Sequence, residues 1–362
     1  MRLALALVFA LACGDDAAPA DSGADAPTLD ARTVDAPAVD APGVDAPSPD
    51  APTVDAPTDT LDLPDERIGF AFVAGHGLDT TTGGGDLAPT VVTTFEELDA
   101  AVDGDAPAVI RIEGSIEGVV RFGSNKTVEG APGSVFTGSF ILSDVQNVIL
   151  RDLTLVGYNC TDDACGDGRD TITIVESHHV WIDHCDISDG SDGNLDITRA
   201  SDFVTVSWTR FHYSGRRPGG HQLSNLVGAS DDAPDDVGRL AITWHHNHWA
   251  DNVQERMPRV RYGRNHIFNN LYTSADNNYC IGLGVFGDLL VENNAFIGVE
   301  DPFNTTSLSN GESKLAASGN LFTDVTGDRD EFGSGVFTPP YAYSLDDAAD
   351  VEAAVRAGVG PR

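Results

Sequence analysis

A polar column that recurs through the second half of the chain constrains its fold more than any other feature. Segments 204–213, 241–250, 266–274, 289–298 and 315–324 align on it, and most of the successive spacings are 23 to 26 residues. One spacing is longer because residues 212–240 are inserted. The column reads Thr209, Asn247, Asn270, Asn294 and Asn320. Two positions later, an aromatic column reads Phe211, Trp249, Tyr272, Phe296 and Phe322.

A strand, an asparagine and an aromatic residue repeated at this period predict a solenoid of parallel strands. The amides are expected to hydrogen-bond between turns, and the aromatic rings are expected to stack inside the coil. A leucine-rich horseshoe needs a regular Leu pattern that is absent here, and a propeller needs about forty residues per unit. We therefore predict an all-β, right-handed parallel β-helix over residues 66–362, with short helices at 94–102 and 346–358 as caps.

A second series of strands precedes the first in each turn, at 170–176, 194–200, 224–230, 256–262 and 279–285. Successive turns stack about 4.8 Å apart, so equivalent positions form a ladder. Asp192, Asn194 and Asp196 alternate along one strand or its lead-in, and Asp170 lies 26 residues before Asp196, close to one turn. Three crowded carboxylates repel one another unless a cation joins them, and oxygen ligands suit Ca²⁺. The alternative is that each Asp caps a turn.

Three arginines lie close together in segment 251–263, about two turns along the same face. In an extended chain Arg259 and Arg261 share a face, and Arg256 lies on the other or is displaced by the bend at Pro258. A guanidinium is suited to gripping a carboxylate, so the cluster favours an anionic ligand. Pairing with surrounding Asp and Glu is the alternative.

The N-terminal region has the composition of an export signal and a tether. Residues 1–13 combine Arg2, an apolar run and an ALAC site that resembles a bacterial lipoprotein cleavage site, with Cys13 as the lipidated residue. An ordinary signal peptide is the alternative. In residues 14–65 the tripeptide DAP recurs every five residues from Asp35 to Asp55, which predicts a disordered acidic linker. The protein is therefore expected to be secreted or lipid-anchored to a bacterial envelope membrane.

Charge and cysteine usage limit the partners further. The formal net charge is −36, of which residues 1–65 contribute −11, so nucleic acid is excluded as a partner because phosphate binding needs a basic surface. Contact with a membrane is expected only through the lipid anchor, and we expect a monomer. Cys160 and Cys165 are a candidate disulfide, which an exported chain permits.

Several segments resemble the pectate lyase family of right-handed parallel β-helices, over about residues 68–357: VWIDHCDISDG (180–190), DGNLDIT (192–198), VTVSW (204–208), TWHHNHW (243–249) and RMPRVRYG (256–263). The resemblance implies Ca²⁺ ligation by Asp170, Asp192 and Asp196. It implies that Arg256 takes the C5 proton of a galacturonate unit and that Arg261 holds the substrate carboxylate, with Arg259 as a further substrate-binding candidate. The implied reaction is β-elimination of α-1,4-linked polygalacturonate to 4,5-unsaturated products.

One departure from the family pattern keeps alternatives open. Many members carry a Lys that contacts substrate in the segment corresponding to 221–228, where this chain has Gln222 and Leu223. Arg216 or Arg217 in the inserted loop is a candidate substitute. The alternatives are a metal-independent pectin lyase acting on methyl-esterified polymer, which the Asp cluster argues against, and a tethered uronate-binding protein without turnover.

The histidines at 245, 246 and 248 are expected to be structural, since no third ligand at zinc spacing is evident.

Overall fold

The computed structural model describes residues 67–158, 168–216 and 221–362, which form one unit from Arg67 to Arg362. The expectations for the signal peptide (1–13, with Cys13), the linker (14–65), the Cys160–Cys165 pair and Arg217 concern residues outside these ranges. Within the described ranges, no helix is both long and apolar enough to cross a membrane.

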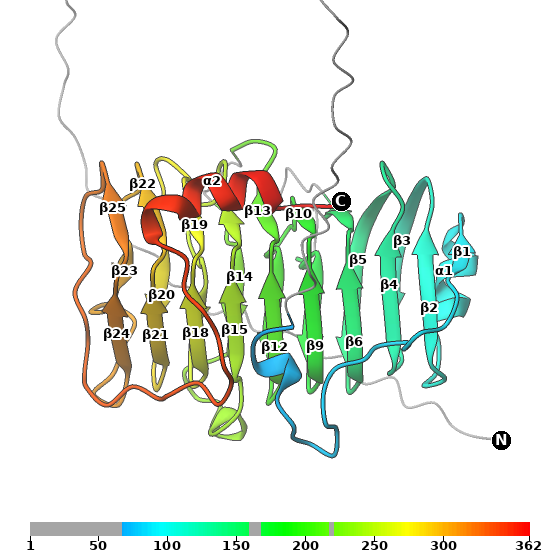
Figure 1. Cartoon of the computed structure of the whole chain (residues 1–362), viewed down its shortest axis with the longest axis horizontal. Helices are drawn as coiled ribbons and strands as arrows, with labels where there is room; N and C mark the ends of the chain where they lie inside the picture. The colour runs from blue at the N-terminus through cyan, green and yellow to red at the C-terminus, as the bar shows by residue number, and fades with distance from the viewer. Residues whose placement is uncertain (1–66, 159–167, 217–220) are drawn as a thin grey trace, which may run out of the picture. The chain divides into compact units, whose positions relative to one another are not determined.

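Parallel strands stacked turn upon turn make up this unit (Figure 1). One sheet has ten strands, in the order β1 (Thr90–Val92), β2 (Ala108–Ile112), β4 (Lys126–Gly130), β6 (Gln146–Arg151), β9 (His178–Asp183), β12 (Asp202–Ser207), β15 (Ile242–His245), β18 (Arg264–Phe268), β21 (Asp288–Glu292) and β24 (Lys314–Ser318). The remaining fifteen strands form a second hydrogen-bonded set with two branches.

Both branches begin at β5 (Val135–Ser143), which also pairs with β3 (Ser115–Arg121). The first branch, called the site branch below, continues through β8 (Ile172–Val175), β11 (Leu195–Thr198), β14 (Asn225–Val227), β17 (Arg259–Val260), β20 (Ile281–Leu283) and β23 (Phe303–Asn304). The second continues through β7 (Thr154–Val156), β10 (Asp186–Ser188), β13 (Arg210–His212), β16 (His248–Trp249), β19 (Leu271–Tyr272), β22 (Ala295–Ile297) and β25 (Leu321–Thr323).

Gly138 lies where β5 divides between the two branches. Its φ of 137° is a conformation that L side chains rarely adopt, and a Cβ there would lie 1.8 Å from the Gly118 carbonyl oxygen. On one side of it, Phe136 pairs with β7, and on the other Phe140 pairs with β8.

The predicted right-handed parallel β-helix is confirmed, and the apolar side chains pointing into the coil form one core from Val92 to Leu315.

The asparagine and aromatic columns stack as predicted. The backbone N–H groups of Thr209, Asn247, Asn270 and Asn294 each donate to the side-chain Oδ1 of the next asparagine, at 3.0, 2.8, 2.9 and 2.9 Å. The rings of the aromatic column lie 4.3 to 5.7 Å apart between centroids, with interplanar angles of 9° to 18°. Buried amides are thereby satisfied by their copies on the neighbouring turns, which fixes the register of the coil.

Asn270→Ala is expected to lower the free energy of unfolding by about 2–3 kcal/mol, because it leaves buried groups on both neighbouring turns without partners. The Asn270 amide accepts from Asn247 and donates to the Trp244 carbonyl oxygen and to Asn294. Asn320→Ala, at the half-buried end of the column, is the matched control and should have a smaller effect. Urea unfolding of both variants tests this, and equal losses would contradict it.

Both predicted helices are present, but only one lies at an end of the coil. α1 (Phe95–Val102) begins with a capping box formed by Thr94 and Glu97 and packs beside β1, β2 and β3. α2 (Ala348–Gly358) instead packs its buried face against β19 and β22, along the flank of the later turns (Figure 1). The expectation that 346–358 caps the last turn is therefore corrected. Two short 3₁₀ turns, Phe70–Phe72 and Pro234–Asp236, complete the elements.

Buried neutral histidines predict that the fold is acid-sensitive. Burial, followed by the charges of Arg356 and Arg210, lowers the pKa of His248 to about 3. An unfolded histidine has a pKa of about 6.5, so only the unfolded chain gains this proton as the pH falls. Stability is therefore expected to fall as the pH drops from about 6.5 towards about 3. His248→Gln should make the fall in melting temperature shallower, and an unchanged slope would contradict this assignment.

Candidate active site

The predicted acidic and basic residues lie on the outer side of the site branch. Asp196 on β11 is level with Leu226 on β14, and Leu226 is level with Arg259 on β17. Side chains alternate between the two faces along each strand, so the next residues, Ile197, Val227 and Val260, face the core. The row Asp196–Leu226–Arg259 therefore places one acid and one arginine of the predicted site on the same face, two strands apart.

Asp170 lies close to one turn before Asp196, as predicted, but the two residues are not level in the strand register. The strand register pairs Asp196 with Thr173, and Asp170 precedes β8 by two residues. Its carboxylate reaches towards the residues that follow it in the chain. Oδ2 accepts a hydrogen bond from the Thr173 hydroxyl at 3.1 Å. The two carboxylates therefore come together through this local bend as well as through the stacking of the strands.

A small space at Gly193 separates the two carboxylates. A Cβ added to Gly193 would lie 2.9 Å from Oδ1 of Asp170 and 3.2 Å from Oδ1 of Asp196. Both oxygens therefore face the space that the glycine leaves free. Oδ1 of Asp170 is buried and has no hydrogen-bond partner among the described residues. A buried carboxyl group in that position is electrostatically favourable only if a cation neutralises its charge or if it is protonated.

The electrostatics of the pair agree with this geometry. Burial, followed by the Asp196 and Asp192 carboxylates, raises the pKa of Asp170 well above its usual range. Burial raises the pKa of Asp196 to about 7, although the nearby Arg256 charge opposes the shift. Like charges that cannot both ionise easily are a frequent feature of functional sites.

The third predicted ligand, Asp192, lies near enough to affect both carboxylates but contacts a histidine. Its Oδ1 lies 3.1 Å from Nε2 of His221, and this contact lowers the pKa of Asp192. Accordingly, no three His, Cys, Asp or Glu side chains in the described part of the chain converge on one point at metal-binding distance. A cation at the Gly193 space fits Asp170 and Asp196 directly, and Asp192 joins them only by leaving His221.

Arg261 is held in place by an acidic loop. Its Nε donates to the Asp231 carboxylate, and its Nη1 donates to the Gly228 carbonyl oxygen at 3.1 Å. Burial and the neighbouring Arg259 charge lower the pKa of Arg261, so a second anion nearby is electrostatically favourable. The alternative of pairing with surrounding acids therefore applies to Arg261 in part. Among the described residues, no side chain accepts from the buried Nε of Arg256.

Leu223 and Arg216 are the residues to consider where many family members carry a substrate-contacting lysine. Leu223 forms a backbone β-bridge with Glu255 on the adjacent turn, and its side chain carries no charge. This position of the site therefore lacks the cation that many family members have. Arg216 pairs with Asp276 at 2.8 Å instead of supplying that charge. The contacts of His221 and Asp231 were not predicted, because both residues lie in the loops that flank β14, where the sequence has no periodic pattern.

Two other polar groups are structural. His246 stacks on Trp208 and contacts Asp346, and His248 contacts the Thr273 hydroxyl, so these histidines share no ligand position.

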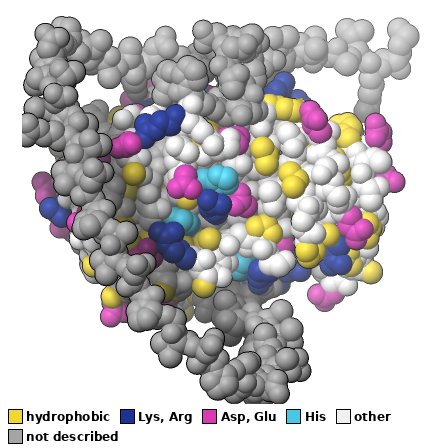
Figure 2. All heavy atoms as spheres, turned by 90° about the horizontal axis from the view of Figure 1, so that it is seen from above, with side chains coloured by type: hydrophobic (Ala, Val, Ile, Leu, Met, Phe, Trp, Pro, Cys, Tyr) yellow, Lys and Arg dark blue, Asp and Glu magenta, His cyan; other side chains and the backbone are white. Residues whose placement is uncertain are grey.

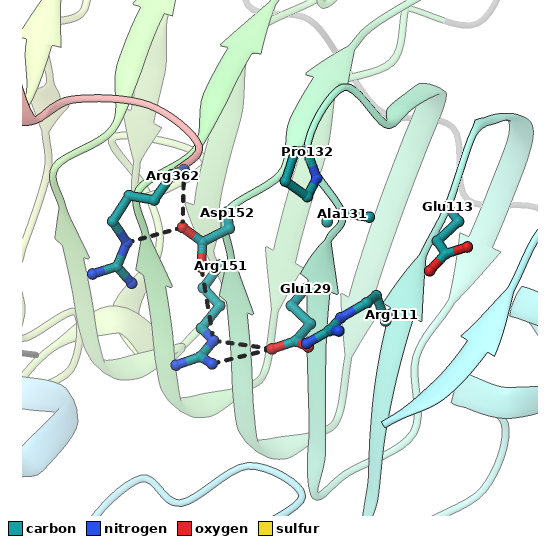
Figure 3. Close-up of a pocket in the computed structure, with 9 residues that line it drawn as sticks. Arg111, Glu113, Glu129, Ala131, Pro132, Arg151, Asp152 and Arg362 are labelled. Carbon is teal, nitrogen blue, oxygen red and sulfur yellow. Dashed lines mark hydrogen bonds and ion pairs between the residues drawn. The ribbon is translucent and has the colours of Figure 1, made fainter. Parts of the chain in front are cut away.

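A hollow of about 360 Å³ lies on the ten-stranded sheet, away from the site branch (Figure 3). Arginines and acids line it in pairs: Arg111 and Arg151 contact Glu129, and Arg362 contacts Asp152. On the face seen in Figure 2, side chains of both charges are likewise intermixed.

The stacked strands define the molecule as a parallel β-helix protein with a paired-carboxylate and arginine site on one outer face. Comparison with solved structures agrees: a pectate lyase from Bacillus sp. N165 in complex with trigalacturonate superposes with a TM-score of 0.65 at 24% identity, covering 81% of this chain and 98% of that chain. A pectate lyase bound to hexasaccharide gives a TM-score of 0.65 at 22% identity, covering 81% of this chain and 96% of that chain.

Sequence comparison identifies the family. The model described as pectate lyase matches residues 65–360. Pectate lyase B of Colletotrichum gloeosporioides is 35% identical over 294 residues, which are 78% of this chain and 83% of that protein. The pectate trisaccharide-lyase of Thermotoga maritima is 36% identical over 221 residues, so the chain spans only 58% of that relative's length. The chain belongs to the pectate lyase family.

Proposed function

We propose that the chain is a Ca²⁺-dependent pectate lyase that cleaves α-1,4-linked polygalacturonate by β-elimination. The observation that carries the proposal is the convergence of Asp170 and Asp196 on the space at Gly193, in the row that leads to Arg259. An acidic protein needs a divalent ion to bind a polyanion, because the ion reverses the local sign of the charge. The names of the relatives and the oligogalacturonate-bound structures support the same substrate.

The residues that would hold Ca²⁺ are Asp170, Asp196 and, after release from His221, Asp192. The unpartnered Oδ1 of Asp170 and the absent side chain at Gly193 fit a hard cation with oxygen ligands. A bound Ca²⁺ would withdraw charge from the substrate carboxylate and so make the adjacent C5 hydrogen more acidic. Arg261 and Arg259 would contribute to the same end by binding that carboxylate from the other side.

In the elimination, Arg256 in its neutral form, after losing a proton to solvent, takes the C5 proton and becomes a guanidinium cation. The C5–H electron pair becomes the C4–C5 double bond as the C4–O bond breaks, and the departing oxygen takes a proton from solvent. The role of Arg256 as base rests on the family resemblance, since arginine is almost never deprotonated in proteins. Glu255 is the rival base, but its carboxylate accepts from the Asn278 amide at 2.7 Å.

A second candidate, a uronate-binding protein without turnover, is favoured by one observation. Leu223 occupies the segment where many family members carry a substrate-contacting Lys, and Arg216 is paired elsewhere. Incubation of the protein with polygalacturonate separates the two. Rising ultraviolet absorbance of unsaturated product that a chelator abolishes supports the lyase, whereas retention on polygalacturonate without product supports the binding protein. A rate unaffected by chelator would instead favour a pectin lyase.

Export and anchoring belong to the same proposal. The apolar run that ends in ALAC and the acidic linker support a lyase held outside the cell by lipid on Cys13. Metabolic labelling with a fatty acid tests this: wild type should take up label and Cys13→Ala should not. Equal labelling would contradict lipidation at Cys13.

A further inference from the structure

A stacked pair of aromatic rings, one half-buried and one exposed, lies beside Arg261. Tyr262 follows Arg261 in the chain, and Phe286 lies one turn further on, after β20. Their rings stack with centroids 5.1 Å apart and an interplanar angle of 21°. Phe286 retains 43% of its exposure and is one of few large apolar side chains exposed in the described part of the chain. We call Tyr262 and Phe286 the aromatic pair.

The aromatic pair is tied to the candidate site by several hydrogen bonds. The Tyr262 N–H donates to the Val285 carbonyl oxygen at 2.9 Å, and its hydroxyl donates to the Asp231 carbonyl oxygen at 2.7 Å. Asp231 also accepts from Arg261, so one loop holds both the guanidinium and the ring. On the neighbouring turn, the Phe286 N–H donates to Oδ1 of Asn310 at 3.2 Å. The pair is therefore a fixed surface, continuous with the position proposed for the substrate carboxylate.

The loop that contacts Tyr262 is acidic. The loop held by the Tyr262 hydroxyl has the sequence SDDAPDD (230–236), and Asp232 and Asp235 on it are exposed. Asp231 is the acid on this loop that pairs with Arg261. A charged galacturonate unit placed there would meet like charges in a low-salt medium. A unit whose carboxyl is a methyl ester carries no charge and adds an apolar methyl group.

A pyranose ring has an apolar face of C–H groups that fits against the negative face of an aromatic ring. We propose that the aromatic pair is a subsite for a methyl-esterified galacturonate unit, next to the ionised unit that Arg261 holds. This inference rests on the proposed lyase function and adds pectin of intermediate esterification to its substrates. The acidic loop disfavours a charged unit there, and Phe286 supplies the stacking surface for the neutral one.

Initial rates on polygalacturonate and on pectin of intermediate esterification, both with Ca²⁺, test the proposal. Phe286→Ala should lower kcat/KM on the partly esterified pectin by about 2- to 10-fold and leave polygalacturonate nearly unchanged. Val237→Ala, which removes another exposed apolar side chain, is the matched control and should alter neither rate. The double variant Asp232→Asn, Asp235→Asn should raise the rate on polygalacturonate relative to partly esterified pectin.

The outcomes separate this inference from the proposed function. Equal losses on both substrates in Phe286→Ala, at an unchanged melting temperature, would overturn the ester subsite while leaving the lyase intact. Unchanged rates on both substrates would overturn it as well. Absence of unsaturated product from both substrates with wild type would refute the lyase function itself.

Discussion

Arg256→Ala is expected to lower kcat on polygalacturonate by about 10²- to 10⁴-fold, the range that a proton-transfer group contributes. The Arg256 side chain is half-buried, and its buried Nε donates no hydrogen bond to any described residue. Its loss should therefore leave the fold intact. Because Arg256 is not a proposed ligand of Ca²⁺, the affinity for calcium should change little. Initial rates of unsaturated product formation, together with calorimetric titration of calcium, measure both quantities.

Arg356→Ala is the control for Arg256→Ala. Arg356 forms an exposed pair with Glu352 on α2, and such pairs contribute little to stability. Its removal should leave the rate near that of wild type. An Arg256→Ala variant with an unchanged rate would contradict the assignment of the base and would direct attention to Glu255.

Asp170→Asn is expected to have opposite effects on stability without and with calcium. Without calcium the variant should be more stable than wild type once the pH exceeds about 4, the usual pKa of an unfolded aspartate, because the raised pKa of Asp170 means that its charge is unfavourable in the fold. With calcium at about 100 times its dissociation constant, wild type should gain about 2.7 kcal/mol of unfolding free energy. The variant should gain little, since its calcium affinity is expected to fall about 100-fold or more.

Asp99→Asn, an exposed position on α1, is the matched control and should respond to calcium as wild type does. Thermal unfolding with calcium and with chelator measures all three proteins. Equal gains in melting temperature for wild type and Asp170→Asn would contradict a calcium site at Gly193.

The fold could be predicted because repetition in the sequence is repetition in space. Each asparagine of the column bonds both to the backbone and to its copy on the next turn, so one residue type at a fixed period specifies both the coil and its register. The pairing of Asp170 with Asp196 was less predictable. The turn at that point contains 23 residues, from Thr173 to Asp196, so the count of 26 identified the right residues with the wrong register.

The remaining contacts of the site come from residues without a periodic signal. His221 and Asp231 lie in the two loops that flank β14, and their partners depend on how those loops fold. Gly193 is informative only after the positions of the two carboxylates are known. Side-chain contacts across an insertion follow from packing in three dimensions, which spacing along the chain does not encode.

A crystal structure of Arg256→Ala soaked with calcium and an oligogalacturonate tests the central claim most directly. We predict an ion in the space at Gly193, bound by Asp170 and Asp196, with Asp192 turned away from His221 and the substrate carboxylate beside Arg261. An oligogalacturonate bound in the site branch with no ion between Asp170 and Asp196 would contradict the account.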